Sequence, residues 1–549
     1  MKKVSRKSTF LAVIFSCLLL SACGNSIPEI KKHALSCAPC EYRNIQTSYE
    51  YCGWPETVTY GQVQKDLDEL CYILKNCYAG YDEAVLRGLN LDEFKKNVCH
   101  RIFAQDPHIF YQNELITAKN KDFLCAIKDE LKDKINDSHF MLWLGDYDFW
   151  WKLCEKSFVF YSDLFVEKKN GSYYLVEKEL PDSNSLGFYG LKEGQKYFGK
   201  EENLFYYPSK GENVYRIGIF TPWAESLSVQ IDGNSVLVPV SSEVAIWVRQ
   251  SLRYGEKFTD KSAYISISRL LSPDESSRHR KGAEKNLKRF CAAGKDCQDK
   301  ENVILDLRSN GGGNDTYVLY FLTGLYVQKE KIAREKVFDD YINAVAAIIS
   351  EKQDQNKNVC VLSPCVLQGE VEYIKKFCPD VQYFPVFKKL LKYFKKNCFR
   401  ITVEAKEIFK SGVDVNKIAK IKESISEPYF KGKLYILIDR NTGSSAEETV
   451  IFAKHLFGDN VILVGENSSG CMSYGNIVYY RLNESKIAIQ ASYSDFTGCM
   501  NGLDSWHGEG KGFFPDVWTE RSNLLDTLRI LIDDPALPEK IQYLDSALQ

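Results

Sequence analysis

Two segments of this chain decide its fold: NVILDLRSNGGGND at residues 302–315 and YILIDRNTGSSAEETVIFAKHLFGDNVILVGE at residues 435–466. Each segment opens with an apolar run rich in β-branched residues, which predicts a buried strand. Three glycines follow the first strand, whereas a Gly-Ser-Ser-Ala turn and a helical pattern follow the second. We therefore expect an α/β core crossed by helices, with strands at 303–307, 433–438 and 461–464.

The two turns carry groups that are typical of acyl-transfer chemistry. Glycines after a strand let backbone N–H groups face a ligand closely. A serine at a strand-to-helix turn places its hydroxyl at a helix N-terminus, where developing negative charge is favoured. Taken alone, the glycines are a common loop signal and the Ser-Ala-Glu-Glu run is a common helix start. It is their combination that indicates a serine nucleophile beside a hole lined by backbone amides.

Three short motifs carry a resemblance to a known family. The runs NVILDLRSNGGG and SSAEE and the later GEGKGFFPDV resemble the C-terminal processing peptidases, and more narrowly the branch that includes the core of tricorn protease. The likeness covers roughly residues 60 to 520. It implies a ClpP/crotonase-like catalytic core, hydrolysis of peptide bonds in a peptide or protein substrate, and no metal or organic cofactor.

The resemblance also implies the nucleophile and the oxyanion donors. The family nucleophile is the serine of a Ser-Ala-x-Glu pattern, which falls on residues 445–448, so Ser445 rather than Ser444 is expected to attack. The backbone N–H groups of Ala446 and Gly312 are expected to bind the oxyanion. One such donor typically lowers the barrier by about 3–4 kcal/mol.

The general base is implied by a departure from the commoner family pattern. Relatives of the Ser/Lys type use the lysine of a G-E-x-x-x-G-K pattern, but this chain reads GENSSGC and has Cys471 in that place. The tricorn-like branch instead uses a histidine in an Asp-x-His context, and NDSHF supplies Asp137, Ser138 and His139. Its acid lies in an E-x-x-G-x-x-P-D pattern, which GEGKGFFPD matches with Glu509.

The implied site is therefore a tetrad with distinct roles. The serine attacks, the histidine takes and returns the proton, and the remaining two residues orient and stabilise the imidazolium. The four residues, in that order, are Ser445, His139, Glu509 and Ser138.

Three alternatives stay open at this point. Lys511, close in sequence to the expected acid, would serve a Ser/Lys peptidase. His507 is a second candidate for the base, or a pocket residue. A non-catalytic peptide-binding lipoprotein on the same fold would keep the cleft without the chemistry.

The N-terminus predicts export and a lipid anchor. A cationic start is followed by an apolar run at residues 10–20 that is too short to span a membrane comfortably. Small residues and Cys23 come next, which resembles a bacterial lipobox, so Cys23 is the expected lipidated residue; the alternative is an ordinary signal peptide. We expect an extracytoplasmic protein held on the inner or outer membrane of the bacterial envelope.

The net charge bears on the class of binding partner, and the cysteine content bears on disulfides and metal binding. The net charge of -2 gives no indication of a nucleic-acid partner. Nothing in the sequence indicates an oligomeric state. Removing Cys17 and Cys23 from the 18 cysteines leaves sixteen, an even number in an exported chain, which favours disulfides over metal binding. Neighbouring pairs that suit short disulfide loops are Cys37/Cys40, Cys71/Cys77, Cys291/Cys297 and Cys360/Cys365.

The expected organisation is multidomain, with a helical domain and a strand-rich segment before the core. Ser185–Phe188 and Gly190–Gly194 faintly resemble the loop and turn of a peptide-carboxylate-binding module of the PDZ type, although ordinary strand turns are the alternative. The expected segments are a signal peptide at 1–22, a tether at 23–55, a helical domain at 56–137, a strand-rich middle region at 138–300, and a core at 301–535 with an inserted helical segment at about 325–425.

Overall fold

The protein divides into two compact units. The computed structural model describes residues 46–47, 53–103, 116–145, 149–178, 186–242, 254–270, 280–332, 335–353, 358–377, 388, 390–392, 401–404, 415–500 and 502–537. Unit 1 comprises Met1–Glu155, Asp339–Ser424 and Cys471–Gly502. Unit 2 comprises Lys156–Phe338, Ile425–Gly470 and Leu503–Gln549.

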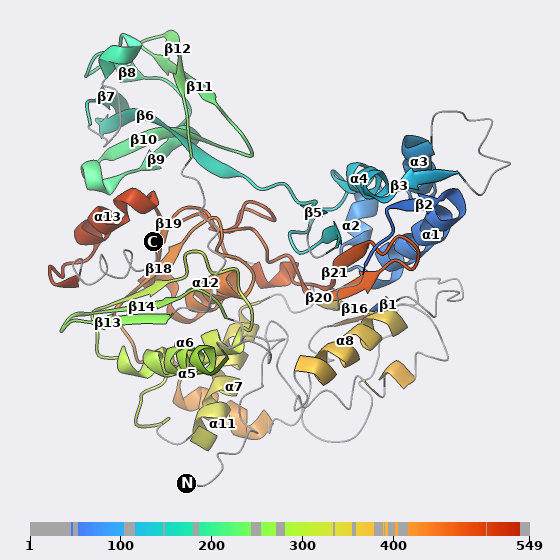
Figure 1. The fold of residues 1–549 in the computed structure, drawn as a ribbon. Coiled ribbons are helices and arrows are strands. Elements are labelled where there is room, and N and C mark those ends of the chain that lie inside the picture. The colour runs from blue at the N-terminus through green and yellow to red at the C-terminus, as the bar shows by residue number, and fades with distance from the viewer. Residues whose placement is uncertain are drawn as a thin grey trace. The chain divides into compact units, whose positions relative to one another are not determined.

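Unit 2 contains the expected α/β core as a six-stranded sheet (Figure 1). The sheet is parallel except for its edge strand β13, which runs antiparallel. Three of its central strands are those predicted from the sequence, β15, β18 and β19, and this confirms the predicted fold class. In sheet order the strands are β13 (Tyr254–Phe258), β14 (Ser262–Ile267), β15 (Asn302–Asp306), β18 (Lys433–Ile438), β19 (Val461–Gly465) and β22 (Val517–Trp518).

Helices cover both faces of this sheet, which explains why its central strands are mainly apolar. On one face Leu524 and Leu528 join a cluster with Ile304 and Tyr435. Figure 1 shows α5 and α6 on the other side of the sheet from α13. The helices of unit 2 are α5 (Arg280–Asp296), α6 (Thr316–Tyr326), α12 (Ser445–Phe457) and α13 (Leu524–Leu531), with 3-10 turns η7 (Gly458–Asn460) and η9 (Arg521–Asn523).

The strand-rich middle segment is a second, antiparallel sheet of unit 2. Its order is β12-β11-β8-β7-β6-β10-β9. The Leu186–Tyr189 part of the expected PDZ-like loop forms a 3-10 helix, η3. The strands are β6 (Phe158–Lys169), β7 (Ser172–Val176), β8 (Lys196–Tyr197), β9 (Leu204–Tyr206), β10 (Val214–Thr221), β11 (Ser226–Ile231) and β12 (Asn234–Pro239), with 3-10 turns η4 (Glu201–Asn203) and η5 (Pro208–Lys210).

A buried ion pair attaches this sheet to the core. Arg216 of β10 is 5% exposed, and its guanidinium contacts the carboxylate of Glu520, which follows β22. The Arg216 Nε also donates to the Ser162 carbonyl at 2.7 Å. Because an unpaired buried charge is costly, these contacts hold the middle sheet on the end of the chain that carries the GEGKGFFPD motif.

Unit 1 combines the predicted N-terminal helices with an antiparallel sheet from distant parts of the chain. Thr59 and Gln62 form a capping box at the start of α1, as expected for a helix that begins at this point. Asp66 of α1 accepts from the N–H groups of Glu484 and Ser485 at the turn between β20 and β21. The helices are α1 (Tyr60–Cys77), α2 (Tyr81–Leu86), α3 (Leu91–Phe103), α4 (Asn120–Leu131), α8 (Pro364–Phe377) and α11 (Val415–Ser424), while α7 (Glu335–Glu351) passes from unit 2 into unit 1.

The sheet of unit 1 includes strands from the segment at about 325–425, which the sequence predicts to be an insertion in the core. Residues 339–424 belong to this unit rather than to the core sheet of unit 2. The domain boundaries given above from the sequence stay predictions. The strands are β1 (Gln46–Thr47), β4 (Met141–Leu144), β5 (Phe149–Lys152), β16 (Val359–Leu362), β17 (Ile401–Glu404), β20 (Tyr474–Arg481) and β21 (Ala488–Asp495), beside a separate pair β2 (Thr57–Thr59) and β3 (Thr117–Lys119) and a 3-10 turn η8 (Thr497–Met500).

The expectation of disulfides between neighbouring cysteines is wrong for the three described pairs. Cys71, Cys291 and Cys360 have free thiols, so none is joined to its neighbour in the sequence. Cys71 and Cys77 lie six residues apart on α1, a rise of about 9 Å, and disulfides need Cα atoms within about 7 Å. The thiol of Cys360 instead lies 3.1 Å from the Ser494 hydroxyl.

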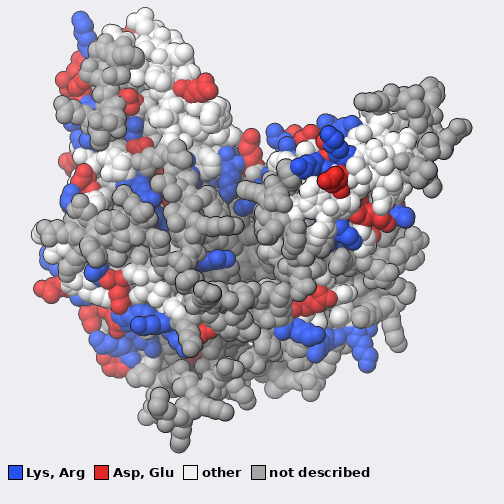
Figure 2. All heavy atoms as spheres, viewed as in Figure 1, with Lys and Arg blue, Asp and Glu red and all other residues white. Residues whose placement is uncertain are grey.

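The predicted signal peptide, Cys23, Cys37 and Cys40 lie outside the described residues. Of the helices that the structure describes, none combines the length and the apolar character required to span a bilayer. Figure 2 shows basic and acidic side chains interspersed over the described part of the face it draws, in line with the net charge of -2. On that described surface, mixed charge offers no broad field of one sign to attract a polyanion.

Candidate active site

The candidate site of unit 2 is built where the carboxyl ends of β15 and β18 meet. Because the two strands are parallel neighbours, the loops that follow them lie at the same edge of the sheet. The Gly443 N–H donates to the Asn310 carbonyl at 3.0 Å. The Ser309 N–H donates to Asp439 Oδ1 at 2.8 Å, and the Thr442 hydroxyl donates to the Leu307 carbonyl at 2.9 Å. These hydrogen bonds join the glycine loop to the serine turn.

Ser445 begins α12 at this junction. It is 7% exposed, and its hydroxyl donates to the Gly313 carbonyl at 2.9 Å. The preceding Ser444 has φ 53° and ψ −128°, a conformation that is rare for residues other than glycine and recurs at functional turns. A Cβ on Gly312 would lie 2.8 Å from the Ser445 nitrogen, so only glycine permits this approach.

The two N–H groups expected to form the oxyanion hole are already hydrogen-bonded. The Gly312 N–H donates to Asn310 Oδ1 at 2.9 Å, and the Ala446 N–H donates to the Gly443 carbonyl at 3.1 Å. The carbonyl of Gly313, rather than an amide, faces the Ser445 hydroxyl. The candidate nucleophile Ser445 therefore lies at this junction, while both expected oxyanion donors are hydrogen-bonded inside the protein.

Two glutamates fasten the first turn of α12. Glu447 Oε2 accepts from the Ser444 N–H at 3.2 Å, and Glu447 Oε1 accepts from the Gly470 N–H at 2.8 Å. Glu448 is buried and hydrogen-bonds Asp315, and burial together with that neighbouring acid raises the pKa of Glu448 well above its usual range. The carboxyl pair behind Ser445 therefore retains a proton at a pH at which exposed acids have lost theirs.

Glu509, the expected acid, lies in a glycine turn that is tied to the loop before Cys471. The Gly510 N–H donates to the Gly470 carbonyl at 2.8 Å, and the Ser157 N–H donates to the Gly510 carbonyl at 3.0 Å. Glu509 itself is 8% exposed. Asp516 of the same motif has a structural role, because it accepts from the Leu463 N–H at 2.7 Å.

Unit 1 places His139 in a tight turn before β4. The His139 N–H donates to Asp137 Oδ1 at 2.7 Å, and the Phe140 N–H donates to the Asp137 carbonyl at 3.0 Å. Asp137 is fully buried, which raises its pKa to about 7, and its Oδ1 lies 3.8 Å from His139 Nδ1. Ser138 is buried in the same turn.

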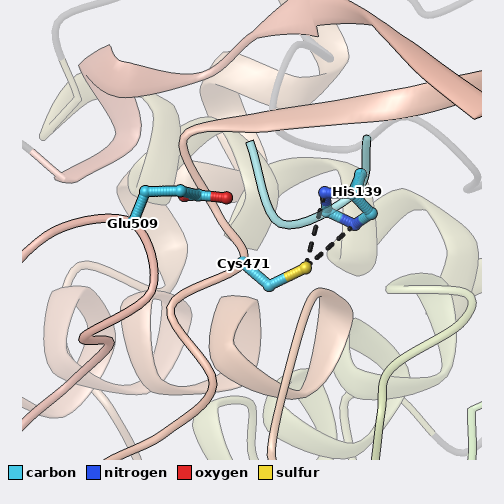
Figure 3. Close-up of side chains that lie close together, drawn as sticks. All are labelled: His139, Cys471 and Glu509. Carbon is cyan, nitrogen blue, oxygen red and sulfur yellow. Dashed lines mark hydrogen bonds between the residues drawn. The ribbon is translucent and has the colours of Figure 1, made fainter. Parts of the chain in front are cut away.

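Cys471 contacts the His139 ring within unit 1. Its Sγ lies 3.4 Å from Nδ1 and 3.3 Å from Nε2, as Figure 3 shows. Sequence reasoning noted Cys471 only as the residue standing in place of a lysine, and it did not foresee this contact. The Asp137–His139 contact agrees with the Asp-x-His spacing of the sequence, since an aspartate commonly accepts from the backbone N–H two residues on.

The sequence-predicted residues thus divide between the units. Unit 2 brings Ser445 together with Gly312 and Ala446 and carries Glu509, whereas unit 1 carries Ser138 and His139. Among the described residues, neither unit by itself gathers three His, Cys, Asp or Glu side chains as metal ligands.

The two rival residues have other contacts. The His507 ring stacks on Phe514 with centroids 3.6 Å apart, and burial and Lys511 lower its pKa. The Lys511 backbone belongs to the turn around Gly470, where its carbonyl accepts from Asn467 Nδ2 at 2.9 Å. These contacts give His507 a packing role in the GEGKG turn.

Comparison with known proteins supports the predicted family. Residues 261–497 match the model of Peptidase family S41, which confirms the resemblance to a peptidase family over a little under half of the chain. No match was found among curated proteins.

Several solved structures are similar at low identity. A photosystem II D1 C-terminal processing protease is 10% identical, with a TM-score of 0.31, over 84% of this chain and 94% of that chain. Mature CPAF complexed with lactacystin is 11% identical, with a TM-score of 0.35, over 89% and 99%. Tricorn protease is 14% identical, with a TM-score of 0.28, over 87% and 37%.

The first prediction concerns the close approach at Gly312. Gly312→Ala should lower the free energy of unfolding by about 1–3 kcal/mol, because the residue has φ 93° and its Cβ would meet residues 443–445. Gly311→Ala is the matched control, since a Cβ there meets nothing within 4 Å. Urea unfolding monitored by circular dichroism measures both, and equal stability of the two variants would contradict the geometry.

The second prediction concerns the buried carboxyl pair. The raised pKa of Glu448 means that the folded state binds a proton more tightly than the unfolded state, so its effect on stability becomes unfavourable as the pH rises above about 4.3. Glu448→Gln should remove this loss and become more stable relative to the wild type, by up to about 1.4 kcal/mol per pH unit within that window. Unfolding at about pH 5 and about pH 8 tests this. Glu427→Gln is an exposed control, and a Glu448→Gln effect equal at both pH values would refute the assignment.

Proposed function

We propose that this protein is a serine-type peptidase of the bacterial cell envelope, held outside the cytoplasm by a lipid on Cys23. The family match to residues 261–497 supports peptidase chemistry. The observation that carries the proposal is Ser445 at the start of α12, held against the glycine loop that follows β15. A hydroxyl at a helix N-terminus beside a flexible glycine backbone is suited to acyl transfer.

In the proposed reaction His139 takes the Ser445 proton and returns it to the leaving amine. The bond from the Ser445 hydroxyl to the Gly313 carbonyl has to break first, so the conformation described here corresponds to a resting state. The N–H groups of Gly312 and Ala446 would exchange their internal acceptors for the substrate oxyanion. Glu509 and Ser138 would support the imidazolium, and Asp137 would orient the ring from its own turn.

The proposed nucleophile and the proposed base belong to different units, so the proposed reaction requires both units. The alternative function, a peptide-binding lipoprotein without chemistry, predicts binding with no covalent intermediate.

The third prediction addresses the nucleophile. Ser445→Ala should abolish both peptide hydrolysis and labelling by a fluorophosphonate probe, because it removes the hydroxyl that lies at the start of α12 against the glycine loop. Ser444→Ala is the matched neighbour and should retain most labelling, with a cost of about 1 kcal/mol in stability from the lost helix cap. Undiminished labelling of Ser445→Ala would show that the nucleophile is elsewhere.

The fourth prediction separates the two candidate bases. His139→Ala should lower kcat by about three or more orders of magnitude, because members of a catalytic set act as a unit. Lys511→Ala, a substitution in the same loop as the expected acid, should cost far less. A dead Lys511→Ala enzyme beside an active His139→Ala enzyme would replace this mechanism with the Ser/Lys one.

The fifth prediction concerns the anchor. Cys23→Ser should leave the protein unlipidated, because the acyl chains are attached through that sulfur in the lipobox interpretation. Membrane fractionation and metabolic labelling with palmitate measure the outcome, with Cys17→Ser as the control. Palmitate incorporation into the Cys23→Ser protein would rule out this anchor.

A further inference from the structure

The contact between Cys471 and His139 forms a chemical site of its own within unit 1. The Sγ of Cys471 lies within 3.4 Å of both ring nitrogens. Figure 3 marks these two contacts with dashed lines. The Asp137 carboxyl lies 3.8 Å from Nδ1. The Cys471 thiol therefore lies beside the His139 imidazole, and the Asp137 carboxyl group lies beside the same ring. This is the arrangement that activates nucleophiles in general: a base within reach, itself held by a third group.

The contact allows the thiol proton to pass reversibly to the neutral ring. An imidazolium next to a sulfur stabilises the thiolate, which is the reactive form of cysteine. When it is ionised, Asp137 stabilises the positive ring in turn. Two contacts hold the backbone of residue 139: the His139 N–H donates to Asp137 Oδ1, and Gln490 Nε2 donates to the His139 carbonyl.

Cys71 and Cys125 differ from Cys471 in exposure and in the groups around the thiol. Cys71 and Cys125 are more exposed than Cys471, which is 7% exposed. Burial nevertheless raises the pKa of Cys71 to about 12 and also raises that of Cys125. A reaction governed by access alone would select Cys71 or Cys125, whereas one governed by thiolate character would select Cys471.

We propose that Cys471 is a site of covalent modification by peroxides, and that its oxidation switches the peptidase off. The switch rests on the proposed function, because it acts by disabling His139 as the base. The thiolate sulfur attacks one peroxide oxygen, an S–O bond forms and the O–O bond breaks. The sulfur is oxidised to a sulfenic acid, and the peroxide is reduced to hydroxide, which takes the proton from the imidazolium to become water.

Oxidation of the Cys471 sulfur prevents His139 from acting as the base. The added oxygen has to fit into a contact of 3.3 Å between the sulfur and the ring, so it either displaces the ring or hydrogen-bonds to it. The ring nitrogen that meets the added oxygen is then unavailable for the proton of Ser445. A reducing thiol reverses the sulfenic acid, so the loss of activity is recoverable.

The test follows modification and activity separately in the full-length protein. Limited iodoacetamide, with peptide mapping by mass spectrometry, ranks the thiols by rate, and Cys471 should react about tenfold or more faster than Cys71 and Cys125. His139→Gln should slow the alkylation of Cys471 by about tenfold, because the base is removed. Faster labelling of Cys71 or Cys125, or an unchanged rate in His139→Gln, would overturn the proposal even if the protein had no peptidase activity.

The second arm exposes the protein to hydrogen peroxide. Wild-type hydrolysis should fall in proportion to oxidation of Cys471 and return with dithiothreitol. The peptidase activity that remains in Cys471→Ser should be insensitive to hydrogen peroxide, whereas Cys125→Ser should lose activity like the wild type. Full activity of an oxidised wild type would overturn the switch, and so would a substrate-derived acyl group on Cys471, which would make that cysteine the nucleophile. Loss of the proposed function is recognised independently by absence of hydrolysis before any treatment.

Discussion

The site of unit 2 depends on one close approach between two loops. The backbone of Gly312 lies against residues 443–445, where any side chain would collide, and a hydrogen bond from Gly443 to Asn310 closes the junction. Parallel pairing of β15 and β18 brings both loops to one edge of the sheet. The position of Ser445, the conformation of Ser444 and the orientation of the Gly313 carbonyl all follow from this junction.

The same junction explains the state in which the site is found. Each group that would bind an oxyanion has an acceptor inside the protein, and the serine proton is held by a carbonyl. Such internal hydrogen bonds keep buried polar groups satisfied while no substrate is present. The N–H of Gly312 has only a side-chain acceptor to exchange, which is a small rearrangement for a loop of glycines.

Local sequence patterns were sufficient to predict β15, β18 and β19 and the serine turn. Continuous apolar runs predict buried strands, and the glycines and the Ser-Ala pair mark the turns that follow them. They could not predict which thiol meets His139, since Cys471 and His139 are far apart in sequence and meet only through the pairing of β4 with β21 and of β21 with β20. The disulfide prediction failed for a similar reason: closeness in sequence was taken for closeness in space, yet a helix holds Cys71 and Cys77 apart. The hydrogen-bond acceptors of the Gly312 and Ala446 N–H groups depend on the local backbone conformation, which a sequence motif does not specify.

We propose that Ser445 of unit 2 and His139 of unit 1 act on one substrate. A crystal structure of the protein after reaction with a fluorophosphonate would show whether both residues reach the same adduct. We expect phosphorus bonded to Ser445 Oγ, a ring nitrogen of His139 within about 3.2 Å of an oxygen of the adduct, and the Gly312 and Ala446 N–H groups turned toward the phosphoryl oxygen. An adduct on any other residue, or a His139 ring that remains against Cys471 without reaching the adduct, would contradict it.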